Sequence, residues 1–310
     1  MLKDVSGKTA FITGGASGMG LGMAKAFARH GMKVVIADIR QHALDEAMAD
    51  FSETNFPVHA VRLDVTDRDQ WMRAADETEK VYGKVHLLVN NAGVGLAGKP
   101  MQNATYKDWD FNLSVNVGGV VNGLVTFLPR MLAHGEAGHV VSTSSTGGFS
   151  AVGGAGLYCT AKYAVAGMME SLATDLQGTN LGASVFFPGP VRTSLGQTTQ
   201  EVRPAHLRDE APAGDAPRLH IPPFDPNVFM DPVEVGERVL RGVRHGDLFI
   251  MSHPEFRDGL AARNNALLRA IPKDAPNEER AAVVKLFGTL IYNPIYDKQD
   301  EVPALETPES

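Results

Sequence analysis

Short apolar runs alternate with helical segments over the first 190 residues, and this alternation constrains the fold more than any other feature. The runs expected to form strands are residues 9–13, 34–38, 58–65, 86–93, 139–145, 183–190 and, less distinctly, 246–251. The helical patterns are at 20–30, 41–51, 67–82, 105–134 (interrupted around 115–123) and 156–177. Continuously apolar strands joined through helices form a parallel sheet that is covered on both faces. The sequence therefore predicts a single-domain α/β protein with a Rossmann-like, doubly wound parallel sheet of about seven strands.

Two regions depart from this alternation. Residues 194–230 hold six prolines among scattered leucine, isoleucine and phenylalanine residues, which favours a substrate lid over the alternative of a disordered linker. Residues 278–292 carry the pattern of a terminal helix. We therefore expect residues 1–255 to form one domain, including the lid. Residues 256–310 would form an extension that packs on the core or on a subunit interface.

Composition excludes several classes of protein. The chain is 44% hydrophobic and 21% charged, with a net charge of −7, which argues against nucleic acids and anionic membranes as partners. The N-terminus enters a strand pattern at once, without a signal peptide, and no apolar run reaches the roughly 18–20 residues of a membrane span. The one cysteine, Cys159, excludes an internal disulfide. We predict a cytoplasmic protein without a metal site, since the ten histidines form no ligand cluster and His134 and His139 are expected at the surface.

A glycine-rich loop, TGGASGMG at residues 13–20, lies between the first strand and the first helix. Gly14 permits a tight turn, and Gly18 and Gly20 remove Cβ atoms where a pyrophosphate and a neighbouring strand must approach. The helix N-terminus offers free N–H groups to phosphate. The residues expected to contact a dinucleotide here are Gly14, Ser17, Gly18, Met19 and Gly20.

Asp38 ends the second strand, where a carboxylate can accept hydrogen bonds from an adenosine ribose and repels a 2′-phosphate. This favours NAD over NADP. Arg40 is close by and could neutralise a phosphate, so NADP stays open. In isolation Asp38 could equally be a turn or helix-capping residue.

Tyr158 and Lys162, in the segment YCTAK, are four positions apart and share a helix face. A free phenol has a pKa near 10, and a neighbouring ammonium favours the phenolate. The pair could therefore act in general acid–base catalysis. Taken alone, it could also be an ordinary surface pair.

Six motifs follow one another in the chain: TGGASGMG, NNAG (90–93), Asn116, STSS (142–145), YCTAK and PGPVRT (188–193). In this order they resemble the short-chain dehydrogenase/reductase family, densely over residues 5–193 and loosely over 231–255. The resemblance implies a hydride transfer between a nicotinamide cofactor and an alcohol or ketone.

The resemblance also assigns roles. Tyr158 would be the general acid–base, and Lys162 would lower its pKa and hold the nicotinamide ribose. Ser145, with Ser144 as the neighbour that could be confused with it, would bind the substrate oxygen, and Asn116 would hold a relay water. Asn90 would brace the central sheet. Further cofactor contacts are implied for Asp64 (or a helix-capping role), Val65, Asn91, Ala92, Gly93, Pro188, Gly189, Val191 and Thr193.

The expected substrate is a hydrophobic secondary alcohol or its ketone, because the segments 94–101, 146–157 and 194–230 are apolar and glycine-rich. The C-terminal region resembles family members that act on bulky aryl alcohols, including lignin-derived ones, and sterols are an alternative. The resemblance implies a homodimer or homotetramer that pairs through the helices at 105–134 and 156–177. The alternative function is a dinucleotide-binding regulatory protein without turnover, although such relatives tend to lack the tyrosine or the lysine.

Overall fold

The structure is a computed structural model that describes residues 2–96, 98–209, 225, 228–288 and 293–303. Its centre is a seven-stranded, all-parallel sheet in the order β3-β2-β1-β4-β5-β6-β7. The strands are β1 (Thr9–Thr13), β2 (Lys33–Asp38), β3 (Val58–Arg62), β4 (Leu87–Asn90), β5 (Gly138–Thr143), β6 (Leu181–Phe187) and β7 (Phe249–Met251). The predicted doubly wound sheet of about seven strands is confirmed.

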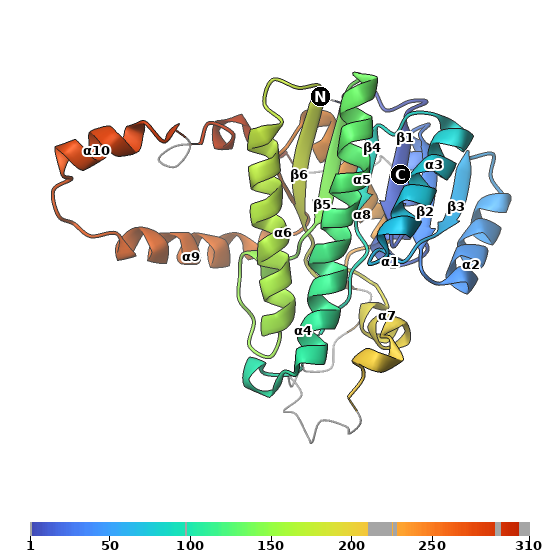
Figure 1. Cartoon of the computed structure of the whole chain (residues 1–310), viewed down its shortest axis with the longest axis horizontal. Coiled ribbons are helices and arrows are strands. Elements are labelled where there is room, and N and C mark those ends of the chain that lie inside the picture. Colours follow the sequence, from blue (N-terminus) through green and yellow to red (C-terminus); the bar gives the residue numbers. More distant parts are fainter. Residues whose placement is uncertain (1, 97, 210–224, 226–227, 289–292, 304–310) are drawn as a thin grey trace.

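Helices cover both faces of the sheet, with α5 and α6 in front and α8 behind in Figure 1. One face carries α1 (Gly18–Arg29), α2 (Gln41–Ser52) and α8 (Pro232–His245); the other carries α3 (Arg68–Tyr82), α5 (Gly119–His134) and α6 (Gly156–Asp175). Each face has its own apolar cluster. A Cβ on Gly22 would lie 2.0 Å from the carbonyl oxygen of Pro232, so only glycine allows α1 and α8 to pack this closely.

The helix that the sequence predicts at 105–134 is continuous rather than broken. Between α4 (Tyr106–Leu113) and α5 it passes through a π-helical turn, Ser114–Gly118. Such turns insert a residue without ending the helix and occur frequently at functional sites. By length and hydropathy Tyr106–His134 could cross a membrane, but 56% of its apolar 18-residue window is buried inside the protein, as in a core helix.

Several helices were not predicted. A helix α7 (Leu195–Val202) and a short 3₁₀ helix η4 (Ala205–Leu207) form the described part of the predicted lid, while residues 210–224 and 226–227 of that lid lie outside the described residues. The other short helices are η1 (Met101–Asn103), η3 (Thr146–Gly148), η6 (Pro254–Phe256) and η8 (Tyr296–Lys298).

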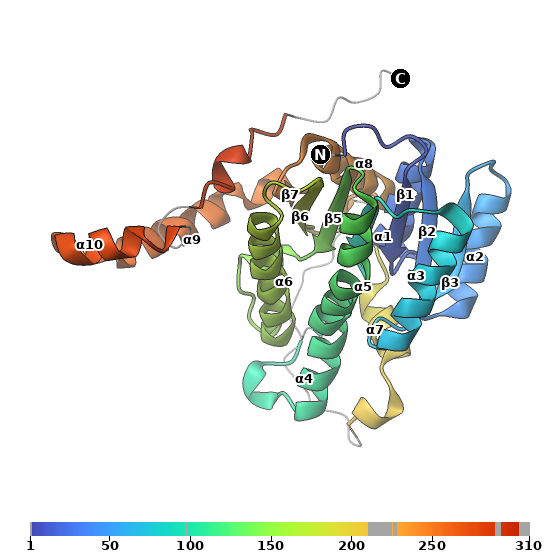
Figure 2. The ribbon, with the colours of Figure 1, turned by 45° about the horizontal axis from the view of Figure 1, so that its top comes forward.

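Beyond β7 the chain forms α9 (Arg257–Ala270) and α10 (Glu278–Lys285), which project from the body as an arm (Figures 1 and 2). The predicted helix at 278–292 is present in its first half, and residues 289–292 are outside the described part of the chain.

His139 corrects a prediction, because it is fully buried rather than at the surface. Its Nε2 lies 2.6 Å from Ser184 Oγ, and burial lowers its pKa to about 3. Its position on the interior strand β5 explains the burial, and its ring lies against Gly182 of the neighbouring strand. His139 is therefore a neutral structural residue.

Candidate active site

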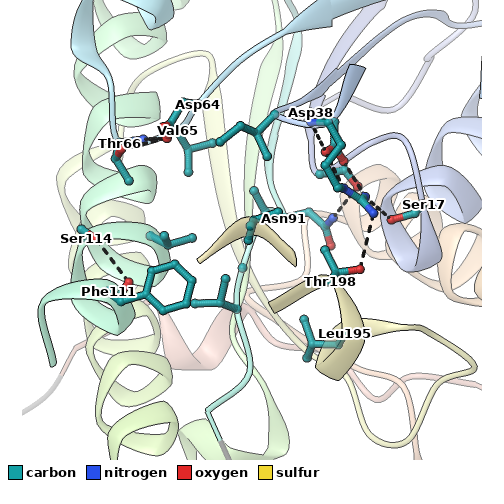
Figure 3. A pocket seen from close by; sticks show the side chains of 18 of the residues that line it. Ser17, Asp38, Asp64, Val65, Thr66, Asn91, Phe111, Ser114, Leu195 and Thr198 are labelled. Atoms are coloured by element: carbon teal, nitrogen blue, oxygen red, sulfur yellow. Dashed lines mark hydrogen bonds and ion pairs between the residues drawn. The ribbon is translucent and has the colours of Figure 1, made fainter. Parts of the chain in front are cut away.

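A cavity of about 500 Å3 opens at the carboxyl edge of the sheet (Figure 3). This edge of a doubly wound sheet is where such proteins bind ligands. The predicted residues that line it are Gly14, Ser17, Gly18, Met19, Asp38, Asp64, Val65, Asn91, Ala92, Gly93, Tyr158, Lys162 and Thr193. The predicted residues that do not line it are Gly20, Asn116, Ser145, Pro188, Gly189 and Val191.

The glycine loop forms one end of the cavity. Gly14 and Gly18 have φ angles of +61° and +50°, which favour glycine. Ser17 is the N-cap of α1, but its side chain makes no capping hydrogen bond. The backbone amides of the first turn of α1 therefore stay available to a phosphate. Gly20 plays a different part from the one predicted. A Cβ there would lie 1.9 Å from the oxygen of Gly14, so Gly20 closes the loop on itself rather than lining the cavity.

Asp38 is 6% exposed, and Arg40 engages both of its carboxylate oxygens. Arg40 Nε and Nη2 donate to Oδ1 and Oδ2 over 3.1 Å each, and Nη2 also donates to Ser17 Oγ over 2.7 Å. The carboxylate and the guanidinium therefore occupy the same corner of the cavity (Figure 3). A ribose hydroxyl would meet Asp38, whereas a 2′-phosphate would meet Arg40 and Ser17.

Asp64 and Val65 line the cavity after β3. The alternative role for Asp64 as the cap of the next helix is wrong, because Asp67 caps α3 by accepting from the amide of Gln70 over 2.9 Å. Asp64 instead accepts from both the amide and the hydroxyl of Thr66, at 2.9 and 2.8 Å, and this turn holds the cavity wall.

Tyr158 and Lys162 lie side by side on α6, with Lys162 Nζ 5.5 Å from the centre of the phenol ring. Lys162 is 4% exposed, and Nζ donates to the carbonyl oxygen of Thr143 over 2.9 Å. No carboxylate pairs with it in the part of the chain that the structure describes. Burial lowers the pKa of Lys162 to about 8.

The pKa of Tyr158 is shifted in the direction opposite to the one that the sequence predicts. Burial raises it, and the hydrogen bond with Ser145 offsets only part of the rise. Desolvation disfavours the charged phenolate, and the pKa of Lys162 is lowered by the same burial. In the protein alone, the lysine therefore does not make the phenol acidic.

The structure distinguishes the two serines at the end of β5. Ser144 Oγ donates to the carbonyl oxygen of Lys162 over 2.8 Å, which ties the strand to α6. Ser145 hydrogen-bonds Tyr158 and accepts from the amide of Gly147 over 3.1 Å. Of the two, Ser145 is the one placed beside the phenol.

Asn116 lies on the π-helical turn and is 1% exposed. Its Nδ2 donates to Val94 O and Asn112 Oδ1, both over 2.9 Å, and its Oδ1 accepts from the amide of Val94 over 3.0 Å. Both amide hydrogens are thus used within the chain, and the side chain fixes the segment after β4. The relay role of Asn116 stays a prediction.

The loop after β6 is fastened from the C-terminal side by residues that the sequence did not suggest. The amide of Gly189 donates to Ser252 Oγ over 2.9 Å, and Ser252 Oγ lies 2.6 Å from His253 Nδ1. His253 Nε2 lies 3.1 Å from the carbonyl oxygen of Pro190 and must donate to it, so Nδ1 of a neutral ring accepts from Ser252. We call this closed set of hydrogen bonds the Ser252–His253 clamp. The amide of Thr146, next to Ser145, donates to the Pro188 carbonyl oxygen of the same loop over 3.0 Å.

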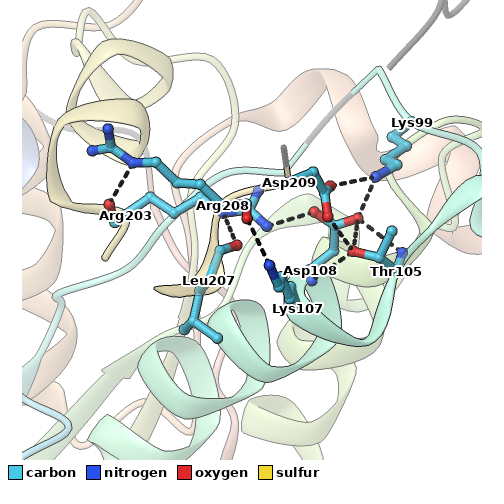
Figure 4. Close-up of polar contacts among 8 residues, drawn as sticks. All are labelled: Lys99, Thr105, Lys107, Asp108, Arg203, Leu207, Arg208 and Asp209. Carbon is cyan, nitrogen blue, oxygen red and sulfur yellow. Dashed lines mark hydrogen bonds and ion pairs between the residues drawn. The ribbon is translucent and has the colours of Figure 1, made fainter. Parts of the chain in front are cut away.

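The described part of the lid is anchored at Asp108, the buried N3 residue of α4 (Figure 4). Its carboxylate accepts from Lys99, from Thr105 and, over 2.8 Å, from Arg203. Burial alone would raise the pKa of Asp108, but these donors hold it well below its usual range. Two segments that are distant in the sequence, residues 99–108 and the helix end at Arg203, therefore meet at one carboxylate.

No group of three histidine, cysteine, aspartate or glutamate residues in the described ranges is placed to hold a metal ion. The cavity does fit a dinucleotide. It combines an uncapped helix N-terminus, a carboxylate where a ribose would lie, and a buried ammonium without an ion-pair partner among the described residues. Fold and site together define a Rossmann-type protein of the kind that binds nicotinamide dinucleotides.

Comparison with known proteins identifies the family. A family model described as "short chain dehydrogenase" matches residues 8–204, and the chain belongs to this family of oxidoreductases, which act on alcohol groups with NAD(P). The chain is 37% identical over 277 residues to "C alpha-dehydrogenase" of Sphingobium sp. (strain NBRC 103272 / SYK-6), covering 87% of this chain and 88% of that one.

Two solved structures are similar throughout. LigO of Sphingobium sp. strain SYK-6, in its apo form, has 38% identity and a TM-score of 0.76, with 94% of this chain and 99% of that chain covered. A short chain dehydrogenase/reductase from Burkholderia phymatum in complex with NAD has 32% identity and a TM-score of 0.79, with 88% and 99% covered.

Proposed function

We propose that the protein is an NAD-dependent dehydrogenase for hydrophobic secondary alcohols or their ketones, with Tyr158 as the general acid–base. One observation carries the proposal. One cavity is lined both by the glycine loop at an uncapped helix N-terminus with Asp38 and by the Tyr158–Lys162 pair, and Ser145 hydrogen-bonds the phenol.

The residues divide the work as follows. When bound, NAD supplies the hydride acceptor, and its oxidised ring adds a positive charge that favours a phenolate. Ser145 orients the substrate oxygen, and Tyr158 takes the hydroxyl proton as the ketone forms and returns it in the reverse direction. With a pKa near 8, Lys162 can pass that proton onward and donate to ribose hydroxyls. The pKa of Tyr158 is then lowered only when NAD is bound in the cavity.

We assign NAD rather than NADP because the buried carboxylate of Asp38 lies in the corner where the 2′-hydroxyl of the adenosine ribose would bind. Arg40 opposes this preference, but its Nε and Nη2 already donate to Asp38 and Ser17. The relative from Burkholderia phymatum was solved with NAD, which supports the same assignment.

Two features support an uncharged, apolar substrate. Side chains that line the cavity include Val94, Phe111, Val115, Leu195, Val202 and Leu207. The nearby cations Lys99, Lys107 and Arg203 each donate to an acceptor of the chain itself, which leaves them committed rather than available to a substrate carboxylate (Figure 4). The similarity to a C alpha-dehydrogenase agrees with an alcohol substrate.

We further propose a homo-oligomer. Val121, Val125 and Leu132 form a stripe on α5 and are 38%, 70% and 46% exposed. Exposed apolar stripes of this kind mark interaction surfaces. The cytoplasmic location stays a prediction.

The test is NADH formation with neutral aromatic secondary alcohols and with short 2-hydroxy acids, using NAD+ or NADP+. We expect turnover of the aromatic alcohols with NAD+, and a loss of at least about 10³-fold in Tyr158→Phe. Tyr163→Phe, on the other side of the same helix, is the matched control. Equal rates in Tyr158→Phe and the native protein would remove the phenol from the mechanism. Cofactor binding without turnover of any alcohol would favour the regulatory protein.

A further inference from the structure

No side chain of the arm formed by residues 257–288 is fully buried, although Leu260 in its first turn packs partly against the core. Six large apolar side chains on it are more than half exposed: Leu267, Leu268, Ile271, Val283, Leu286 and Phe287. Its helices have only 14 and 8 residues, and helices of this length are marginal in water without a surface to pack on. The arm therefore needs a surface to pack on, and the described part of its own chain does not provide one.

Both ends of the arm are fixed to α6. At the outgoing end, the guanidinium of Arg263 lies 5.5 Å from the centre of the Tyr163 ring. At the returning end, Tyr296 donates its hydroxyl hydrogen to Glu170 over 2.5 Å, and Asn293 donates to Thr174 over 2.8 Å.

Further contacts of Tyr296 attach the returning end firmly to the body. The hydrogen bond to Glu170 raises the pKa of Tyr296 to about 12, and the Tyr296 ring stacks on Phe249 of β7 with centres 6.1 Å apart. The positions Tyr163, Glu170 and Thr174 share one face of α6 at helical spacing. The arm is thus a helical hairpin held out from a fixed base (Figure 2).

We propose that this arm docks on a second copy of the same chain, so that each protomer holds its partner. The inference rests on the proposed homo-oligomer and gives it a specific contact. In a symmetric pair each arm would meet the same surface on the other protomer, and both arms would be buried together.

Charge favours a second copy as the occupant. The arm holds six lysine and arginine residues against four aspartate and glutamate residues, a net charge of +2. The whole chain has a net charge of −7, so the residues outside the arm carry −9. A basic arm is attracted to an acidic body of its own kind, and opposite charge steers association.

Continuity of apolar surface favours the same occupant. The helix α5, with its exposed stripe at Val121, Val125 and Leu132, lies beside α6, where the arm is rooted (Figure 1). The stripe on α5 and the root of the arm are therefore on neighbouring helices, and the arm extends outward from there (Figure 1). A second protomer can cover both surfaces at once.

The test is sedimentation equilibrium of the full chain and of the double variant Leu286→Ser/Phe287→Ser. Both residues are largely exposed, so the body should stay folded. We expect the native chain to be an oligomer and the variant to have a dissociation constant raised by at least about 100-fold. The matched control is Met72→Ser/Val81→Ser, at exposed apolar positions on α3, which should not change the mass.

An unchanged dissociation constant in the arm variant, or a native chain that is monomeric at micromolar concentration, would overturn the proposal. Hydrogen exchange adds a local readout, because the amides of α9 and α10 should be protected in the oligomer and lose that protection on dilution. Arm-dependent flotation with phosphatidylglycerol vesicles, without any change of mass, would assign the arm to membranes instead. NADH titration of each variant keeps the two proposals separate. Failure to bind NADH would reject the proposed function, whereas the sedimentation result alone decides whether the arm docks on a second copy.

Discussion

The carboxyl edge of the sheet and the α9–α10 arm break the ordinary rule of burial in opposite ways. At the edge, Lys162 is 4% exposed although it is an ammonium. On the arm, Leu286 and Phe287 are 83% and 59% exposed although they are apolar. Charged side chains are normally outside and large apolar ones inside.

The two departures differ in what resolves them. At the edge, the buried ammonium of Lys162 lies next to a cavity that fits a dinucleotide, so a bound small molecule can supply its missing partners. The arm exposes apolar surface that only a macromolecule can cover. Substitutions at the edge should therefore change chemistry and ligand binding, whereas substitutions on the arm should change assembly.

The largest expected effect is at Lys162. Lys162→Met should lower kcat by about 10³-fold, because it removes the group that we propose carries the proton onward. It should also stabilise the fold at pH 7 by up to about 3 kcal/mol, because burial lowers the pKa of this lysine to about 8 from 10.5.

The sign of this stability effect sets its pH window. The cost of the buried ammonium is fully present below pH 8 and disappears as the pH rises toward 10.5. Urea unfolding at pH 7 and pH 10 should therefore show the advantage of Lys162→Met at the lower pH only. The exposed Lys80→Met is the control. A variant that is less stable than the native protein at both values would contradict the prediction.

The next effect concerns the lid. Asp108→Asn weakens the charge-assisted hydrogen bonds from Lys99 and Arg203 that anchor residues 195–209. We expect the Michaelis constant for the alcohol to rise about 10- to 100-fold with a smaller change in kcat. Asp209→Asn, at the exposed end of the same network, should have a smaller effect. A fall in kcat alone would place Asp108 in the chemistry rather than in the lid.

The Ser252–His253 clamp gives a smaller, more selective effect. His253→Gln disturbs the loop at Gly189 and Pro190, which leads to Thr193 in the cavity wall. We expect the dissociation constant of NADH to rise about five- to tenfold while that of ADP-ribose, which lacks the nicotinamide, stays unchanged. Both are measured by calorimetry, with the exposed His245→Gln as control. Equal weakening of both ligands would argue against a role at the nicotinamide end.

The smallest effect is expected on the arm. Phe287→Ala should change the free energy of unfolding of the dissociated chain by less than about 0.5 kcal/mol, whereas Phe127→Ala in the core should cost about 3–5 kcal/mol. The measurement is urea unfolding at decreasing protein concentration. A large loss at Phe287 in the monomer would mean that the arm packs on its own body.

The sheet was predictable because an apolar run bounded by glycine or proline is a local signal. The errors concentrate at the carboxyl ends of strands. The run 58–65 was assigned to a strand, but β3 ends at Arg62 because the last residues leave the ladder to build the cavity wall. The helix α8 was missed although Asp231 and Pro232 are a typical helix start.

At the site, motif order predicted which residues come together, and burial decided what they do there. The raised pKa of Tyr158 and the separation of Ser144 from Ser145 both depend on tertiary packing that no local pattern contains. The clamp was invisible for another reason, since Gly189 and Ser252 are 63 positions apart in the chain.

Gly93 has a consequence for how such enzymes can change their role. A Cβ at this position would lie 2.8 Å from Asn116 Oδ1 and 3.4 Å from Lys162 Nζ. One added methyl group would therefore collide with the side-chain amide oxygen of Asn116 and would touch the ammonium of Lys162, without altering Tyr158, Ser145 or Asp38. A chain of this kind can thus keep every polar group of its site and still have that site rearranged by a single carbon atom.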